Sequence, residues 1–473
     1  MAEHGWEPNS RRRKLLFDFA EYTSAHGFIG IQRTKSSFKR ALWALATLAM
    51  WGLCMYQIFV AVGKYFEYNT VVSIQIKHST NVSFPAVTLC NLNPLRASWH
   101  LSNLMKSKKE NVLSDKKNWT EEQWREFNIT QQKPDDMNEE DEIKYKTFEL
   151  IYSKNINLTE AGHSLDKMLL ECTFQSSKCS AANFTRWHHG TYGNCYTMII
   201  PRNKYPSFIG PLYGLSLTLY AQDFEYMPTG WSTAGFRVEV HPAEYVPFPE
   251  DQGFTVSPGA VTSVAVKQVR VDRMPLPYDG TDCGDVKGDD VVLPPETVNQ
   301  SLPHREPVLQ NMFQFYSDVL RRDGYLEKVN YTTQACIKSC YQRQLVKRCS
   351  CVDPSFVTRE QARRYFEPRN MSLPDACKMA YLSSLRCVRK VVKETTEQGM
   401  CEAECPQSCY EQEYLQRITS NLWPRTSYYA SIKDVWQDQL PSMEAMNEAT
   451  KVRTNIAKLE IYFEARHLLL QFQ

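Results

Sequence analysis

The sequence predicts an α+β protein with one transmembrane helix and a large, disulfide-rich extracellular domain that has a β-sheet core and peripheral helices. Three observations support this fold class. A single apolar run occupies residues 41–62. Fourteen of the 15 cysteines follow that run. Several later segments alternate apolar and polar residues with a period of two, which is typical of half-buried strands.

The apolar run, ALWALATLAMWGLCMYQIFVAV, predicts a transmembrane helix over residues 41–63. It contains no charged residue, and about 20 apolar residues cross a hydrocarbon core roughly 30 Å thick. Four basic residues lie just before it: Arg33, Lys35, Lys39 and Arg40. Because basic flanks stay in the cytoplasm, residues 1–40 are expected to be cytoplasmic and residues 64–464 extracellular. A signal peptide is the competing interpretation, but signal peptides begin at the N-terminus and have shorter apolar cores.

The glycosylation sequons agree with this orientation. Eight Asn-x-Ser/Thr triplets occur, all of them after residue 80, where average composition would give about three by chance. The asparagines are Asn81, Asn118, Asn128, Asn157, Asn183, Asn299, Asn330 and Asn370. We therefore expect a plasma-membrane glycoprotein with most of its chain outside the cell.

The fourteen cysteines after the run predict seven disulfides, because their number is even and the compartment is oxidising. Nine of them lie between Cys336 and Cys409, with C-x3-C and C-x3-C-x3-C spacings that suit stapled helix faces. Zinc ligation is the alternative, but these spacings are not those of zinc fingers, so no metal is expected. Cys54 lies in the predicted span and is expected to be a buried, reduced thiol.

Local patterns predict the order of elements in the extracellular part. Strands are predicted over residues 82–89, 212–220, 236–240 and 261–271, and helical segments within 307–350 and 360–392. Residues 106–142 are dense in Lys, Glu and Asp and predict a solvated, partly helical excursion, either a charged surface or a binding segment. His188 and His189 are adjacent, so they would point to different faces of a strand or helix, and a surface loop is predicted for them.

Composition and motifs argue against several function classes. The net charge is +2 with a pI near 7.8, so no overall field favours nucleic acid. The chain contains no Gly-rich phosphate loop followed by Lys-Ser/Thr, no His-Glu-x-x-His and no Gly-x-Ser-x-Gly. We therefore expect neither an enzyme nor a cofactor.

Further motifs occur in a specific order along the chain. They are His26-Gly27, FPAVTLCN at 84–91, GNCYT at 193–197, GLSL at 214–217, GFTVSPG at 253–259, CIKSCYQRQLVKRCSC at 336–351, Trp423-Pro424 and LEIYFE at 459–464. In this order, from about residue 20 to residue 464, the sequence resembles the degenerin/epithelial sodium channel family. That family comprises the amiloride-sensitive trimeric channels and includes the acid-sensing channels.

The resemblance implies a fold and a function. The extracellular part would be hand-like, with palm, β-ball, finger, thumb and knuckle, and would stand on two membrane helices per subunit. The protein would be a subunit of a voltage-independent sodium channel, gated or modulated at its extracellular part. Its partners would be membrane lipid, sodium ions, other subunits in a homo- or heterotrimer, and possible extracellular ligands.

The resemblance also implies roles for individual residues. His26 and Gly27 would form a cytoplasmic gating element. The disulfides would be Cys90–Cys195, Cys172–Cys179, Cys283–Cys409, Cys336–Cys405, Cys340–Cys401, Cys349–Cys387 and Cys351–Cys377. Tyr65 and Phe66 would pack against the base of the thumb, with an aromatic belt at the membrane interface as the alternative. Trp423 and Pro424 would lie near the connection of thumb to palm.

Two features depart from the family pattern. Residues 352–400, the predicted thumb, are rich in Arg and Lys with fewer carboxylates, so the sequence offers no acidic pocket for gating by protons. Histidine or carboxylate pairs brought together by folding are the remaining candidates for titration. Residues 465–473, ARHLLLQFQ, stand where the family has a second span with its filter, and as a helix they would cover about 13 Å. The chain is therefore expected not to conduct alone.

Three interpretations follow from this difference. The first is a sodium channel subunit that is truncated at its C-terminal end. The second is a single-span regulatory, dominant-negative subunit that assembles with other subunits. The third is a cell-surface receptor or adhesion glycoprotein.

Overall fold

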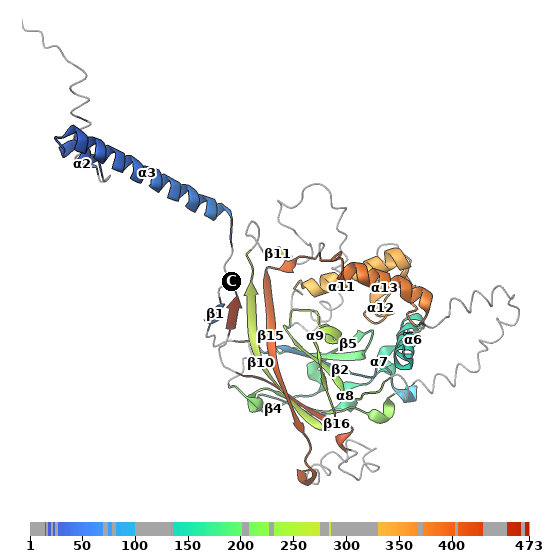
Figure 1. Ribbon diagram of the computed structural model, residues 1–473. Helices are drawn as coiled ribbons and strands as arrows, with labels where there is room; N and C mark the ends of the chain where they lie inside the picture. Colours follow the sequence, from blue (N-terminus) through green and yellow to red (C-terminus); the bar gives the residue numbers. More distant parts are fainter. Residues whose placement is uncertain are drawn as a thin grey trace, which may run out of the picture. The chain divides into compact units, whose positions relative to one another are not determined.

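The computed structural model describes residues 27–69, 74–77, 82–99, 134, 136–200, 208–226, 231–274, 283–284, 330–366, 372–402, 405–428, 452–464 and 469–472, together with residues 15, 18, 19, 22 and 23. The chain forms two compact units (Figure 1). The first comprises Met1–Val71 with Leu276–Gly280, and the second comprises Val72–Pro275 with Thr281–Gln473. Each unit is described by itself below.

The first unit contains a short helix and a long one. Helix α2, Phe28–Arg33, is followed by the 30-residue helix α3, Ser37–Phe66. Helix α3 is long and apolar enough to cross a membrane, and it includes the whole predicted span. It carries Cys54, whose thiol is free and whose side chain is exposed.

The second unit contains two principal sheets. The larger has eight strands in the order β1–β17–β10–β16–β7–β3–β4, with β15 paired to β10 outside this path. These strands are β1 (Ile74–Lys77), β3 (Leu169–Phe174), β4 (Ser177–Lys178), β7 (Leu215–Tyr220), β10 (Ala260–Asp272), β15 (Tyr410–Leu422), β16 (Ile456–Phe463) and β17 (Leu469–Phe472). The 13-residue strand β10 holds this sheet together, because β15 pairs along one of its edges while β16 and β17 pair in succession along the other.

The smaller sheet has five strands in the order β5–β6–β2–β8–β9. They are β2 (Ala86–Asn91), β5 (Phe184–His189), β6 (Gly193–Met198), β8 (Phe236–His241) and β9 (Phe254–Val256). Two small parallel pairs complete the strands: β11 (Cys283–Gly284) with β14 (Gln407–Ser408), and β12 (Cys351–Val352) with β13 (Asp375–Ala376).

The main hydrophobic core joins the two principal sheets. One buried cluster contains Leu215, Leu217 and Leu219 of β7 together with Val238 of β8 and Leu89 of β2. Because strand side chains alternate between faces, these strands each contribute apolar residues to one shared layer. At about 25 cal/mol per Å² of buried apolar surface, this layer is the main stabilising element of the fold.

The helices of the second unit are mostly close to the cysteine-rich segments. They are α6 (Glu139–Ser153), α7 (Leu158–Ala161), α8 (Leu165–Met168), α9 (Pro249–Gln252), α11 (Thr333–Cys349), α12 (Arg359–Phe366) and α13 (Leu382–Thr396), with 3₁₀ turns at Ala181–Asn183, Pro211–Tyr213 and Asp223–Glu225. Helices α11, α12 and α13 lie together, near α6 (Figure 1). A second cluster packs Leu385, Val388 and Val391 of α13 against Leu345 of α11 and Met137 before α6.

Seven disulfides staple the second unit. They are Cys90–Cys195, Cys172–Cys179, Cys283–Cys409, Cys336–Cys405, Cys340–Cys401, Cys349–Cys387 and Cys351–Cys377, the same pairs that the family resemblance implied. Four of them involve α11 or the segment just after it. Each such cross-link restricts the unfolded chain and contributes about 2–4 kcal/mol.

Most strand predictions match the structure, and three local predictions need correction. The strand predicted over 82–89 begins at Ala86 instead, and residues 211–213 form a 3₁₀ turn before β7. His188 and His189 lie on β5 and not in a loop. The end of the tail, Leu469–Phe472, is a strand whose backbone pairs with β1 on one side and with β10 on the other. Residues 101–133 and 307–329 lie outside the described residues.

Candidate functional site: the junction between the five-stranded sheet and helix α11

The five-stranded sheet carries polar side chains on the face that points away from the core. Strand β8 reads FRVEVH, so Phe236, Val238 and Val240 enter the core and the alternating positions Arg237 and Glu239 face the other way. The same alternation in β2 places Thr88 and Cys90 on this second face. A buried polar face on a strand needs partners. Thr88 finds them within the sheet, and Arg237 donates to the Pro249 and Glu250 carbonyl oxygens of α9.

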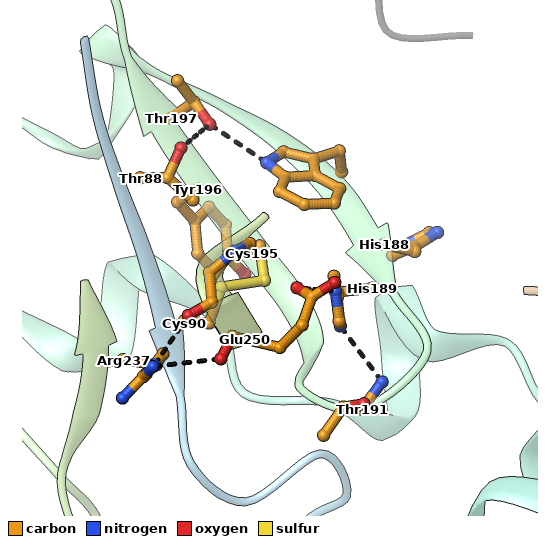
Figure 2. Close-up of a disulfide and its surroundings, with 12 residues drawn as sticks. Thr88, Cys90, His188, His189, Thr191, Cys195, Tyr196, Thr197, Arg237 and Glu250 are labelled. Carbon is orange, nitrogen blue, oxygen red and sulfur yellow. Dashed lines mark hydrogen bonds and ion pairs between the residues drawn. A yellow bond between two sulfur atoms is a disulfide. The ribbon is translucent and has the colours of Figure 1, made fainter. Parts of the chain in front are cut away.

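The second face is anchored by a disulfide between two paired strands. Cys90 of β2 and Cys195 of β6 are direct register partners, and their Cα atoms are 4.4 Å apart (Figure 2). Next to them, the Thr88 hydroxyl lies 2.7 Å from that of Thr197, which also accepts a hydrogen bond of 3.0 Å from Trp187 Nε1. The Thr88 hydroxyl is also 2.9 Å from His241 Nε2, and burial lowers the pKa of His241 to about 4. This part of the face is therefore rigid and uncharged at neutral pH.

The charged part of the face forms what we call the junction cluster: His189, Glu239, Glu250, Asp251 and Lys338. His189 Nε2 on β5 lies 2.9 Å from Glu250 Oε2 on α9 (Figure 2). The other carboxylate oxygen of Glu250 pairs with Lys338 Nζ on α11, and Asp251 Oδ2 lies 2.9 Å from the same ammonium group. Three segments far apart in sequence therefore meet through one glutamate.

The surroundings of Lys338 explain why a lysine is tolerated there. Its side chain is only 10% exposed, and its ammonium group lies 4.1 Å from the ring centroid of Phe356 and 4.9 Å from that of Phe248. Cation–π contacts and two carboxylates replace the water that a buried ammonium loses. Burial raises the pKa of Glu250, but the neighbouring His189 and Lys338 outweigh burial and bring it to about 2.

Glu239 is the unusual member of the cluster. It is 1% exposed, and neither carboxylate oxygen has a hydrogen-bond partner among the described residues. Burial, followed by repulsion from Glu250, raises its pKa well above the ordinary value. Burial without a partner thus favours the protonated form of the Glu239 carboxyl group over the carboxylate.

A second contact area flanks the junction cluster. The turn between β5 and β6 packs against the segment after β12: a Cβ added at Gly190 would lie 2.3 Å from the Pro354 carbonyl oxygen. The Thr191 hydroxyl donates a hydrogen bond of 2.8 Å to the Ser355 carbonyl, and Gln361 Nε2 of α12 donates one of 3.2 Å to the His188 carbonyl. The five-stranded sheet therefore also contacts the segment after β12 and helix α12, through close backbone packing and hydrogen bonds.

Disulfides and strand pairing connect the junction cluster to the larger sheet. Helix α11, which carries Lys338, is bonded through Cys336 and Cys340 to Cys405 and Cys401, just before strand β15. Strand β15 pairs with β10 along its whole length. A movement of the five-stranded sheet would therefore reach the long strands of the larger sheet through α11. Among the described residues, no group of three or more His, Cys, Asp or Glu side chains is placed to hold a metal ion.

The predicted gating element lies in the first unit. His26 is outside the described residues, and Gly27 precedes α2 with φ +106°, a conformation that favours glycine. A Cβ at Gly27 would lie 2.3 Å from Thr47 Oγ1 of α3, and one at Gly30 would lie 2.7 Å from the Trp43 ring. Helix α2 therefore folds back on α3 through glycine contacts.

Of the predicted coupling residues, Tyr65 and Phe66 belong to the first unit, and Trp423 and Pro424 belong to the second. Tyr65 and Phe66 are exposed at the end of α3, with ring centroids 5.5 Å apart. Trp423 and Pro424, joined by a cis peptide bond, follow the last residue of β15. The segment after the helices enters β15 at its other end, after Cys409, and the 13 residues of β15 separate its two ends by about 40 Å. That Trp423 and Pro424 lie near the connection of thumb to palm stays a prediction.

The predicted glycosylation sites are only partly described. Asn157 and Asn183 are both exposed. Asn157 caps the start of α7, and Asn183 is the last residue of the 3₁₀ turn Ala181–Asn183. Asn330 Nδ2 instead donates a hydrogen bond of 2.7 Å to Glu244 Oε2. Asn81, Asn118, Asn128, Asn299 and Asn370 lie outside the described residues.

Sequence reasoning did not identify the junction cluster. Two signals were present: charged and polar residues at alternate positions of an otherwise apolar strand, FRVEVH, and a lysine between the paired cysteines of CIKSC. Neither shows which residues meet, because 61 residues separate His189 from Glu250 and 88 separate Glu250 from Lys338.

Comparisons with known proteins add an independent line of evidence. The sequence model of a family described as "Amiloride-sensitive sodium channel" matches residues 19–471. Epithelial sodium channel subunit alpha of Xenopus laevis is 25% identical over 524 residues, covering 96% of this chain and 74% of the relative.

Two further relatives carry related names. Epithelial sodium channel subunit gamma of Pelodiscus sinensis is 23% identical over 539 residues, covering 95% of this chain and 73% of the relative. The FMRFamide-activated amiloride-sensitive sodium channel of Cornu aspersum is 23% identical over 450 residues, covering 88% of this chain and 63% of the relative.

Proposed function

Because the chain belongs to the amiloride-sensitive sodium channel family, we propose that it is a subunit of a trimeric, voltage-independent channel for passive Na⁺ transport across the plasma membrane. The family match over residues 19–471 is the observation that carries this proposal. The apolar helix α3 and the seven disulfides agree with a membrane protein that has an oxidised domain. Its partners would be lipid, sodium ions and further subunits of a homo- or heterotrimer.

The orientation follows from charge and cysteine usage. We place residues 1–40 in the cytoplasm, residues 41–63 in the membrane and residues 64–464 outside the cell, because the basic residues precede the span and the cysteines and sequons follow it. Glycan mapping tests this orientation at the two exposed, described sequons. Asn157→Gln and Asn183→Gln should each remove one glycan, which appears as a stepwise mass decrease in protein from intact cells. A wild-type chain that carries no N-linked glycan at all would contradict the orientation.

The extracellular part would control the pore through the junction cluster. An extracellular event that shifts the five-stranded sheet would act on α11 through Glu250 and Lys338, and then on β15 and β10 through the disulfides of α11. One relative is named for activation by a peptide, FMRFamide, so an extracellular peptide is a reasonable ligand class for this chain as well. In the first unit, His26, Gly27 and the packing of α2 on α3 would form the cytoplasmic gate element, with Tyr65 and Phe66 as contacts at the outer end of the span.

The direct test is electrical recording from cells that express these 473 residues alone or with epithelial sodium channel subunits. We expect assembly with the other subunits, seen as co-purification, and an amiloride-sensitive Na⁺ current whose size depends on this chain. The regulatory alternative predicts that this chain reduces the current of its partners. Failure to co-purify with any subunit, with no effect on current, would instead favour a receptor or adhesion glycoprotein.

A further inference from the structure

Helix α13 has two faces of opposite character. Its buried residues are Leu385, Val388, Val391 and Thr395, which pack toward α11 and the segment before α6. Four exposed cations, which we call the basic face, are Arg386, Arg389, Lys390 and Lys393. Successive helix residues are turned by about 100°, so these four fall within about 100° of each other and opposite the buried residues. They form a row about 10 Å long on the outside of the helix.

Two of the four cations of the basic face have no carboxylate partner among the described residues. Arg386 and Lys390 form no ion pair or hydrogen bond with any residue that the structure describes. Arg389 pairs with Asp136 at 2.7 Å, with both side chains more than half exposed, and Lys393 is 3.8 Å from Glu397. Glu394, the carboxylate within α13, is turned aside to Arg348 on α11. Asp136 and Glu397 thus offset two of the four positive charges, and because exposed pairs of this kind are weak, a bound polyanion can compete with both carboxylates.

The four cations are also held close to one another. Their spacings are three or four residues, at which helix side chains are neighbours and like charges repel. The disulfide Cys349–Cys387 fixes α13 to α11 next to Arg386, and the buried side of the helix is fully packed. The face is therefore pre-organised, and a bound polyanion would relieve the repulsion without any ordering of the backbone.

We propose that the basic face of α13 binds a linear sulfated polysaccharide of the cell surface or extracellular matrix. The chemistry fits, because a row of cations on a straight helix matches the repeated anions of an extended polymer, and guanidinium groups bind sulfate oxygens in bidentate fashion. An acidic peptide is the competing partner, and the experiment below distinguishes it by competition. The polysaccharide source depends on the extracellular orientation proposed above, and the binding does not depend on channel activity.

The test uses the full chain in detergent and heparin as the probe. We expect the wild-type chain to bind immobilised heparin at physiological ionic strength, with an affinity that falls steeply as salt is raised. The variant R386Q/K390Q, which removes the two cations without partners, should weaken binding at least fivefold. The matched control K154Q/K167Q removes the same charge from two other exposed lysines and should change the affinity less than twofold. R386K/R389K keeps the charge and should stay within threefold of wild type.

Several outcomes would overturn the proposal. Equal losses in R386Q/K390Q and K154Q/K167Q would mean that net charge alone drives binding. Unchanged binding in R386Q/K390Q with an unchanged melting temperature would place the site elsewhere. Displacement of heparin by a polyglutamate peptide at equal charge concentration, or by anionic phospholipid vesicles, would assign the face to another class of partner. Binding of desulfated heparin as tightly as heparin would rule out sulfate recognition.

Discussion

His189 Nε2 lies 2.9 Å from Glu250 Oε2, and this contact joins strand β5 to the short helix α9. The other carboxylate oxygen of Glu250 pairs with Lys338 of α11, so α9 connects the sheet to α11. Only 5% of the His189 side chain and 13% of the Glu250 side chain are exposed. The contact therefore lies in an environment where charge pairs are strong if complete and costly if broken. This property makes the junction cluster the most informative target for mutation.

The Glu250–Lys338 pair should behave as a coupled unit. Glu250→Gln or Lys338→Met alone should each lower the free energy of unfolding by about 3 kcal/mol, because each leaves a buried charge without its partner. The double variant should lose less than the sum of the two. Thermal unfolding of the full chain in detergent, followed by tryptophan fluorescence, measures this. Lys144→Met is the control, since its solvent-accessible pair with Glu140 should contribute little to stability. Strictly additive effects would show that the pair is not coupled.

Glu250 and Glu239 should respond to pH in opposite directions. The pKa of Glu250 is lowered to about 2 in the folded chain, so its stabilising contribution is complete above 4.5, its ordinary value, and is lost as pH falls toward 2. The pKa of Glu239 is raised by burial, so the folded state keeps a proton that the unfolded state releases, and stability falls as pH rises above 4.5 until the folded pKa is reached.

The variant Glu239→Gln separates these two effects. The variant has no carboxyl group to titrate at position 239, so its free energy of unfolding relative to wild type should increase from pH 4 to pH 8. The increase should be about 1.4 kcal/mol for each unit by which the pKa of Glu239 in the folded chain exceeds its ordinary value. Melting temperatures measured across this range for both proteins provide the test. A constant difference would mean that folding does not raise the pKa of Glu239.

The close approach at Gly190 should be intolerant of any side chain. Gly190→Ala places a Cβ within 2.3 to 2.5 Å of the Pro354 and Ser355 carbonyl oxygens, so the two segments must separate, at a cost of about 2–3 kcal/mol. Thr191→Val, at the neighbouring position, should be milder, because it removes only one hydrogen bond to Ser355. It should lower the free energy of unfolding by about 1 kcal/mol. Protease resistance of the full chain at the cell surface reports both. A Gly190→Ala protein as stable as Thr191→Val would refute the close packing.

The two glycine contacts between α2 and α3 should differ in their response to a second mutation. Gly30→Ala collides with Trp43, so Trp43→Ala should restore normal behaviour. Gly27→Ala is different, because φ +106° remains unfavourable for alanine even when Thr47→Ala makes room. Amiloride-sensitive current, corrected for surface expression, is the measurement if the channel assignment holds. Rescue of both pairs would show that space alone matters at Gly27.

Local periodicity accounts for the parts of the fold that could be predicted from sequence. The apolar run produced α3, and the alternating patterns near 236–240 and 261–271 produced β8 and β10, because side-chain spacing is a property of the element itself. The prediction for His188 and His189 failed because the pairing of β5 with β6, which makes those residues a strand, involves a neighbour that the local pattern does not show. The tail became strand β17 for the same reason, through pairing with β1 and β10.

What the sequence alone determined is the set of elements and the family motifs: a membrane helix, β-strands, and cysteines in an order specific enough for the resemblance to imply all seven pairs. What only the tertiary structure decided is which charges meet. His189, Glu250 and Lys338 come from a strand, a short helix and a long helix, and nothing in their local sequence links them. The isolation of Glu239 and the alignment of four cations opposite the packed side of α13 likewise became evident only once burial was known. Burial and charge contact depend on the packing of distant segments, and packing is a property of the whole fold.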